Sequence, residues 1–197
     1  MKTLHVVLLM LLTLIVPMNI YAGTPTDTIK AHVDEVLNVL RASPDGSKRS
    51  DEAKKAEIRV IAGRMFDFTA MSKATLGNNW NKLDKDQRTE FIKLLKAMLE
   101  NAYVSKILGY TDEKAVFIGE RSLSPTRVEV QSTLMARNAD IPMHYRVLKT
   151  EDTWKVYDVI IEGVSLVKNY RTQFRQILAK QTPSELLDVM RQKVGEI

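Results

Sequence analysis

The fold is decided by the stretch WKVYDVIIEGVSLVKNYRTQF, which occupies residues 154–174. Aromatic and β-branched residues lie on both faces from Trp154 to Ile161, and this pattern predicts a strand that is covered on both sides. Gly163 then permits a sharp turn of the backbone. Beyond the turn, apolar residues recur at the spacing of one helix face: Val164, Val167, Tyr170, Phe174 and Ile177. A strand and a helix that meet at such a corner can form two walls of one pocket.

The segment before this stretch has the alternating pattern of strands. The predicted strands are residues 115–122, 126–136, 141–149 and 154–161. Pro125, Asp140 and Asp152 stand in the short turns between them. Strands joined by such short turns pair in opposite directions, so the sequence predicts an antiparallel meander.

Helical patterns flank the predicted sheet on both sides along the chain. Their starts are marked by capping residues or turn signals: Asp27 or Thr28, Asp51, Asp84 with Gln87, Ser165, and Thr182 with Pro183. Helices before and after a run of strands are typical of the α+β class. We therefore expect helices packed around a twisted, roughly four-stranded antiparallel sheet.

Residues 1–22 have the layout of a secretory signal peptide. Lys2 precedes an apolar run from Leu4 to Val16, and Tyr21-Ala22-Gly23 offers a cleavage site with small residues. The run is short for a membrane span, and an uncleaved N-terminal anchor is the alternative. The remaining residues, 23–197, are enough for a single domain with its own core.

Composition excludes several classes of function. The chain has 29 Lys+Arg and 24 Asp+Glu, and loss of Lys2 with the signal peptide leaves 28 against 24. This mild excess, spread along the sequence, is compatible with anionic lipid surfaces and does not argue for nucleic acid. Cysteine is absent, so the core must hold the fold without disulfides. With only His32 and His144 left after processing, a Cys/His metal site is excluded.

The residues that could act in catalysis do not form a familiar set. Ser165 resembles the serine of a nucleophile elbow, but Val167 stands where that motif needs its second glycine, so Ser165 is expected to start a helix. No glycine-rich phosphate loop is present. His144 is expected to be structural or on the surface. Asp158 is the one acid that could be buried with a raised pKa, and its simpler interpretation is a hydrogen-bonded partner at a strand end.

The remaining candidates for a site are apolar residues. Most of them lie in residues 154–174 or near the end of the longest predicted helix, which starts at Asp84. The candidate pocket comprises Tyr103, Ile107, Leu108, Tyr110, Val147, Val156, Ile160, Val164, Val167, Tyr170 and Phe174. From periodicity alone, these residues are more simply explained as core. The functional hypothesis is that some of them line a cavity for an apolar ligand.

Two blocks of the sequence resemble signatures of the MlaC family of toluene-tolerance auxiliary proteins. The central block is LGNNWNKL at residues 76–83, followed by QRTEF at 87–91 and Tyr103. The second is WKVYDV at 154–159 with IEGVSLV at 161–167 and the pair Tyr170-Arg171. This second block is the more specific one, because the whole strand-corner-helix run matches in order. The resemblance extends from about Thr28 to the end of the chain.

This resemblance implies a periplasmic carrier that holds a phospholipid by its acyl chains, in an apolar pocket between a twisted antiparallel sheet and the helices around it. It implies shuttling between an outer-membrane lipoprotein complex and an inner-membrane ABC transporter with an MCE-domain ring. Such transport would maintain the lipid asymmetry of the outer membrane. No cofactor is implied, and we expect a monomer without enzymatic activity.

Three alternatives stay open at this point. A related hopanoid-associated branch shares much of the pattern, so a hopanoid or another apolar lipid is an alternative cargo. A small-molecule enzyme in a cone-shaped α+β cavity could use Asp158 with Tyr157 or Tyr170 as acid and base. An adaptor could instead bind other envelope proteins through basic side chains: Lys168, Arg171, Arg175 and Lys180.

Overall fold

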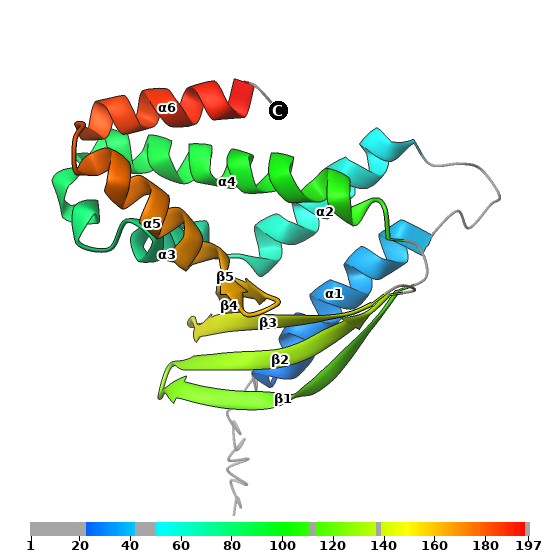
Figure 1. Ribbon diagram of the computed structural model, residues 1–197. Coiled ribbons are helices and arrows are strands. Elements are labelled where there is room, and N and C mark those ends of the chain that lie inside the picture. The colour runs from blue at the N-terminus through cyan, green and yellow to red at the C-terminus, as the bar shows by residue number, and fades with distance from the viewer. Residues whose placement is uncertain (1–22, 42–49, 111–112, 137–138, 196–197) are drawn as a thin grey trace, which may run out of the picture.

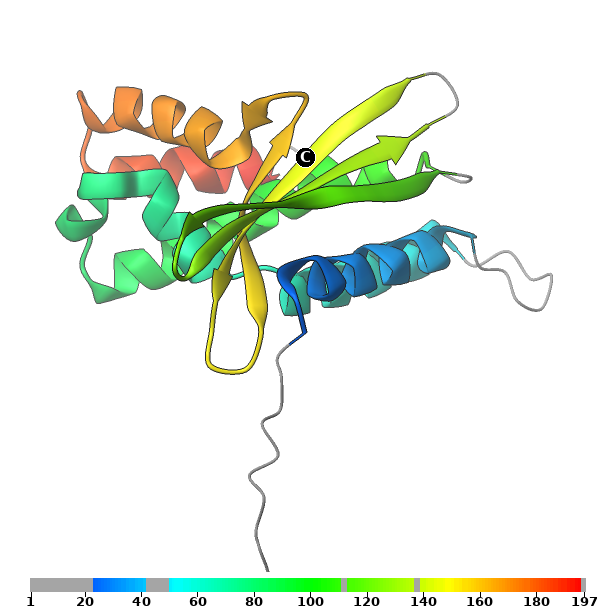
Figure 2. The ribbon, with the colours of Figure 1, turned by 90° about the horizontal axis from the view of Figure 1, so that it is seen from below.

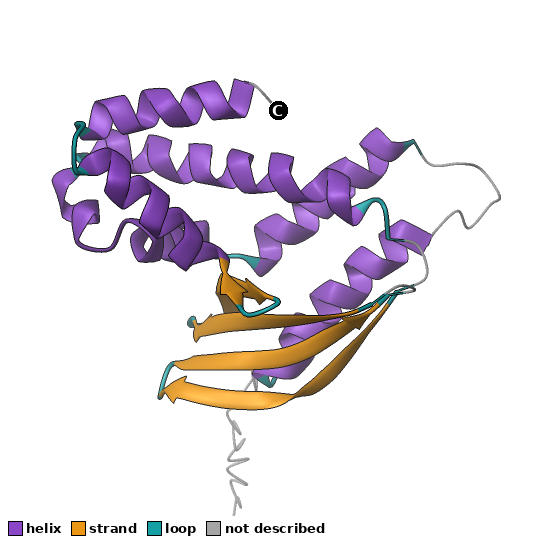
Figure 3. Ribbon diagram, in the orientation of Figure 1, coloured by secondary structure: helices purple, strands orange, loops and turns teal. Residues whose placement is uncertain are grey.

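One antiparallel sheet with the strand order β1-β2-β3-β4-β5 forms one side of the molecule (Figure 1, Figure 3). The computed structural model describes residues 23–41, 50–110, 113–136 and 139–195, so the predicted signal peptide lies outside the described residues. The strands are β1 (Lys114–Ser124), β2 (Arg127–Met135), β3 (Asp140–Lys149), β4 (Trp154–Ile161) and β5 (Val164–Ser165). The predicted antiparallel meander is confirmed, and the two-residue β5 adds a fifth strand to the four expected from the sequence.

The two faces of the sheet differ because successive side chains of a strand alternate between them. β2 and β3 pair without a register shift, so that Val128 lies opposite Val147 and Val130 lies opposite Tyr145. These four residues belong to one apolar cluster, which includes Ile29 of the first helix. The polar residues between them lie on the opposite face of the sheet.

The helices precede and follow the sheet in the chain, as predicted. They are α1 (Pro25–Arg41), α2 (Asp51–Met65), α3 (Phe68–Leu76), the 3-10 helix η1 (Gly77–Lys82), α4 (Lys85–Ile107), α5 (Leu166–Leu178) and α6 (Pro183–Gly195). The predicted capping box of Asp84 and Gln87 at the start of α4 is confirmed. The cap of α1 is predicted wrongly, because neither Asp27 nor Thr28 is the capping residue. The hydroxyl of Thr24 accepts the backbone N–H of Asp27, and Pro25 is the first residue of the helix.

The helices form two groups around the sheet (Figure 1, Figure 2). α1 packs against β1 and β2, and α2 joins α1 to the long helix α4. On the other side of the molecule, α4 packs against α6 and α3 packs against α5. β4 contacts helices of both groups, namely α1 on one side and α3 and α5 on the other.

Buried apolar side chains accordingly fall into three clusters. The bundle cluster lies among α3, α4, α5 and α6 and includes Met71, Phe91, Leu95, Phe174, Leu186 and Met190. The sheet cluster lies between α1 and the sheet and includes Ile29, Met65, Val130, Tyr145, Val147, Val156 and Val159. The hairpin cluster lies among α1, α2 and the end of α4 and includes Leu37, Val39, Leu40, Ile58, Ile61 and Val104. Phe66 packs against both the bundle and the sheet clusters, and Val33 packs against both the sheet and the hairpin clusters.

Candidate functional site

The corner after β4 is a two-residue hairpin turn in which both residues have positive φ. Glu162 has a φ of 49° and Gly163 a φ of 81°, as a type I′ turn requires. The next two residues pair back onto the end of β4 as β5. The sharp turn predicted at Gly163 is therefore confirmed. The assignment of Val164 to the apolar helix face is wrong, because its backbone is still extended and its side chain is 57 % exposed.

Asp158 joins this corner to the first turn of α5. One carboxylate oxygen, Oδ1, accepts a hydrogen bond from the backbone N–H of Val167 at 3.0 Å. The other, Oδ2, accepts from the Ser165 hydroxyl at 2.7 Å and from the Arg146 guanidinium at 3.3 Å. Ser165 itself caps α5 by accepting the N–H of Lys168 at 3.0 Å, which confirms its predicted place at the helix start. Both oxygens of Asp158 are occupied, so the arrangement supports a structural anchor and not a catalytic acid.

Arg146 extends this contact across the outer face of the sheet. Its guanidinium lies 3.1 Å from Glu129 Oε2, and the other oxygen of Glu129 lies 2.8 Å from Arg121. Burial alone would raise the pKa of Glu129, but hydrogen bonds from Arg121 and Arg146 outweigh it and lower the pKa. The result is an alternating row of charges on four neighbouring strands, Arg121, Glu129, Arg146 and Asp158, which are direct cross-strand partners. His144 borders it, with its Nδ1 4.0 Å from Glu129.

Among the eleven predicted pocket residues, Tyr103 of α4 and Tyr170 of α5 are brought close together. Burial raises the pKa of Tyr170, and the neighbouring Tyr103 phenol raises it further. Burial also raises the pKa of Tyr103. Both side chains are only partly buried, and Tyr170 packs on Phe174 with ring centroids 5.8 Å apart. Tyr170 thus lies at the edge of the bundle cluster, with the Tyr103 phenol as its neighbour.

Three further predicted residues gather at the end of α4. Ile107, Leu108 and Tyr110 are partly buried and pack against the hairpin cluster formed by α1 and α2. The same cluster also packs against Ala115 of β1, so it reaches the edge strand of the sheet. The apolar residues that the sequence predicts at this helix end are therefore present there, and they face α1 and α2.

The other predicted residues are buried in the cores, apart from the exposed Val164. Val147 and Val156 are completely buried in the sheet cluster. Val167 and Phe174 belong to the bundle cluster, and Ile160 of β4 is 8 % exposed. Eight of the eleven residues are therefore distributed over three clusters instead of forming one continuous wall, and the other three, Tyr103, Ile160 and Val164, belong to none of them.

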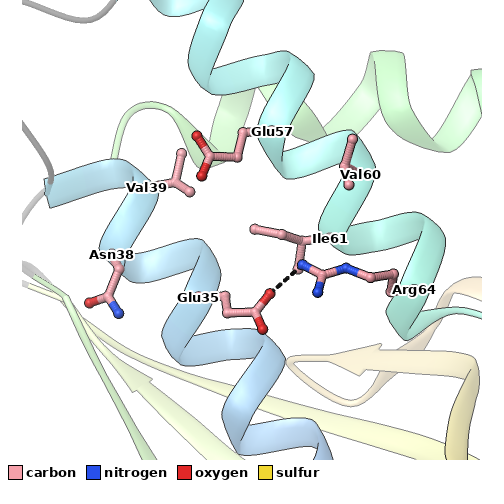
Figure 4. Close-up of a pocket in the computed structure, with 7 residues that line it drawn as sticks. All are labelled: Glu35, Asn38, Val39, Glu57, Val60, Ile61 and Arg64. Atoms are coloured by element: carbon pink, nitrogen blue, oxygen red, sulfur yellow. Dashed lines mark hydrogen bonds and ion pairs between the residues drawn. The ribbon is translucent and has the colours of Figure 1, made fainter.

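A groove between α1 and α2 was not predicted from the sequence. It encloses about 520 Å³, and its rim includes the ion pair of Arg64 and Glu35, with 2.6 Å between nitrogen and oxygen (Figure 4). Val39 and Ile61 line it and are buried members of the hairpin cluster. The groove thus reaches the cluster that also packs against Ile107. Its detection requires the pairing of α1 with α2, which periodicity within either helix does not reveal.

The described residues also bear on a metal site and on a membrane span. In the part of the chain that the structure describes, no three His, Asp or Glu side chains are grouped as metal ligands would be. Nor does that part contain a helix with the length and apolarity needed to cross a bilayer.

Comparisons with known proteins extend these observations. The toluene tolerance protein ttg2D of Pseudomonas putida is 24% identical over 175 residues, which are 88% of this chain and 81% of that protein. The intermembrane phospholipid transport system binding protein MlaC of Haemophilus influenzae is 20% identical over 178 residues, or 88% and 83% of the two chains.

The fold also matches a solved structure, that of a phospholipid-binding protein from Ralstonia solanacearum in complex with a phospholipid. The TM-score is 0.78 with 22% sequence identity, and the match covers 87% of this chain and 97% of the other. At this identity the match establishes the shared fold. The model of the MlaC protein family matches residues 30–192, which is most of the sequence. The chain therefore belongs to the MlaC protein family.

Proposed function

We propose that this protein is a periplasmic phospholipid carrier. The observation that carries the proposal is the shared fold with a protein that was solved with a phospholipid bound, in a chain that belongs to the MlaC family. The H. influenzae relative is named as the binding protein of an intermembrane phospholipid transport system. The signal-peptide pattern at residues 1–22 supports export to the periplasm.

The acyl chains would lie along the border between the three apolar clusters. Residues on this border are partly buried and can exchange protein contacts for lipid contacts without opening a packed core. Five of the predicted residues meet this condition: Tyr103, Ile107, Leu108, Tyr110 and Tyr170. Val147, Val156, Val167 and Phe174 are packed within the cores, and they would reach a lipid only if the sheet and the helices moved apart.

The energetics suit a carrier that exchanges its cargo with membranes. Removal of acyl chains from water is worth about 0.8 kcal/mol per methylene, so two long chains would exceed the usual limit of roughly 20 kcal/mol on affinity. The competing state, however, is a bilayer and not water. Transfer between two apolar environments is nearly balanced, and small movements induced by a partner can then decide whether lipid enters or leaves.

The function would be to shuttle phospholipid between an outer-membrane lipoprotein complex and an inner-membrane ABC transporter with an MCE-domain ring. This exchange would maintain the lipid asymmetry of the outer membrane. The protein would act as a binding and transport component without catalysis. The occupied carboxylate of Asp158 supports this assignment over the enzyme hypothesis, which needs that carboxylate as a base.

The test is a native mass spectrum of the protein purified from the periplasm, followed by extraction with organic solvent. We expect an adduct with the mass of a phospholipid, and its fragments give the head group and the number of acyl chains. A hopanoid in the extract would change the cargo but keep the carrier. A spectrum of the bare protein, combined with no uptake of labelled phospholipid from vesicles, would refute the proposal.

A further inference from the structure

The net positive charge of the chain comes from two segments that contain no acidic residue. Residues 68–83 and 163–184 together hold six Lys and Arg and no Asp or Glu. Without these six, the chain has 23 basic and 24 acidic residues, from totals of 29 and 24. The two segments are about 80 residues apart in sequence, so the excess looks dispersed along the chain.

The fold brings these two segments together at one end of the helix bundle. The first forms α3 and η1, the second forms α5, and α5 contacts both (Figure 1). The Arg171 side chain donates to the carbonyl of Ala74 in α3, through Nε at 2.8 Å and through a second nitrogen. Lys168 and Arg175 lie three residues before and four after Arg171, so all three share one stripe of α5. A single cationic face results, defined by Lys73, Lys82, Lys168, Arg171 and Arg175.

Most cations of this face are exposed and have no acidic partner. Within the described ranges, no carboxylate lies in ion-pair distance of Lys82, Lys168 or Arg175. Lys73 lies 6.0 Å from the ring centre of Trp80, and Arg88 of α4 lies 5.4 Å from it. Two of the acids that border these segments in sequence, Asp84 and Glu185, are engaged as helix caps with nearby backbone N–H groups. Unpaired cations around a partly buried tryptophan are a common feature of surfaces that meet lipid head groups.

We propose that this cationic face docks the protein on an anionic lipid bilayer. An acidic protein surface is the competing partner, and the composition of the face argues against it. A protein interface normally has an apolar core that becomes dry on binding. Among the described residues, the large apolar side chains with high exposure are Val60, Val116, Ile118, Leu123, Met135 and Val164. Only Val164 lies in either acid-free segment, and it stands on β5 before the helix that carries the cations. Exposed cations around a single partly buried tryptophan, without a cluster of exposed apolar side chains, fit a hydrated and fluid anionic surface better.

Docking of this kind is expected to be weak and reversible. Each exposed Lys or Arg near an anionic bilayer strengthens binding by about fivefold, which is the fold-change for roughly 1 kcal/mol. Because salt shortens the range of such attraction, binding should fall steeply between 50 mM and 500 mM NaCl. A face of about five cations would concentrate a carrier at a membrane surface and still release it. This inference goes beyond the proposed function, because it does not require that the interior hold a lipid.

The test compares two double variants that remove the same charge from different places. Lys168→Gln/Arg175→Gln removes two exposed cations from α5, and neither side chain has a described partner whose loss would disturb the fold. Lys114→Gln/Lys149→Gln removes two exposed lysines from β1 and β3 and serves as the matched control. The proteins are sedimented with sucrose-loaded vesicles of phosphatidylglycerol and phosphatidylcholine, or of phosphatidylcholine alone, at low and at high salt.

We expect the unmodified protein to bind the anionic vesicles and not the neutral ones, with loss of binding at high salt. The α5 variant should bind about 25-fold more weakly, and the sheet variant should bind within about twofold of the unmodified protein. Absence of binding to anionic vesicles, or equal loss in both variants, would overturn the proposal. Native mass spectra of all three proteins report the bound lipid independently, so failure of docking and failure of the carrier function remain distinguishable.

Discussion

Asp158 of β4 and Val167 of α5 are joined by a hydrogen bond of 3.0 Å from the backbone N–H of Val167 to the Asp158 carboxylate. The bond connects β4, which contacts both groups of helices, to α5, which closes the bundle cluster. Because Arg146 bonds the same carboxylate, the outer face of the sheet is linked to this helix as well. The position of α5 relative to the sheet therefore depends on one buried side chain.

Replacement of Asp158 by Asn should destabilise the protein by about 2–3 kcal/mol. The change removes the charge that Arg146 and the free N–H groups of α5 face in a buried site, and it leaves the guanidinium with Glu129 as its one remaining carboxylate among the described residues. The measurement is urea unfolding followed by circular dichroism. Ser165→Ala is the control within the same cap, with an expected cost of about 1 kcal/mol. A loss below 0.5 kcal/mol for Asp158→Asn would contradict the assignment of an anchor.

Stability should fall at acid pH, in part through Glu129. Its pKa in the folded protein is lowered from 4.5, because hydrogen bonds from Arg121 and Arg146 outweigh its burial. A lowered pKa contributes stability that is present above the unfolded pKa and is lost as the pH falls through the folded value. Glu129→Gln should therefore reduce the free energy of unfolding most at pH 7, and the difference from the unmodified protein should shrink below pH 4. A difference that does not change between pH 7 and pH 3 would show that the charge of Glu129 is not responsible.

The turn at Glu162 and Gly163 should respond to substitution in opposite directions. Both residues have positive φ, where a side chain normally costs about 1–2 kcal/mol and where Asn is tolerated better than Glu. Gly163→Ala should lower the free energy of unfolding by about 1–2 kcal/mol, although no atom obstructs its new methyl group. Glu162→Asn should raise it by a few tenths of a kcal/mol or more, which thermal unfolding of the two single variants would measure. Equal stability of all three proteins would mean that the turn relaxes to another conformation.

Much of the fold could be predicted because the decisive signals are local. The alternation of apolar residues identifies the four long strands, and capping residues identify the starts of α4, α5 and α6. The helical assignment of Val164 is wrong although Val164 and Val167 are three positions apart, as neighbours on one helix face would be. Val164 lies in the hairpin strand β5 instead, and the spacing alone does not distinguish the two cases. Periodicity records spacing and contains no information on the φ values that place β5 before the helix.

The candidate site could be predicted only in part, because it depends on contacts between distant segments. Tyr103 and Tyr170 are 67 positions apart in sequence, and only the packing of the bundle brings them together. Val147 and Val156 share the apolar character of these residues but are sealed between the sheet and α1. A sequence pattern marks all four as apolar and buried. It does not tell which of them face a border that a ligand could enter.

Tyr103→Glu should reduce the amount of copurifying phospholipid at least tenfold and leave the fold intact. Tyr103 is only partly buried, so its replacement does not place a carboxylate in a closed core, but the charge would lie beside the proposed path of the acyl chains. Ile118→Glu is the matched control, since Ile118 on β1 is 66 % exposed and the substitution should change neither lipid content nor stability. The measurement is the phospholipid-to-protein ratio in native mass spectra, with thermal unfolding as the check on folding. Because a ligand stabilises the state that binds it, delipidation should also lower the Tm of the unmodified protein and of Ile118→Glu, and lower that of Tyr103→Glu much less. Equal lipid content in all three proteins would place the acyl chains away from the border between α4 and α5.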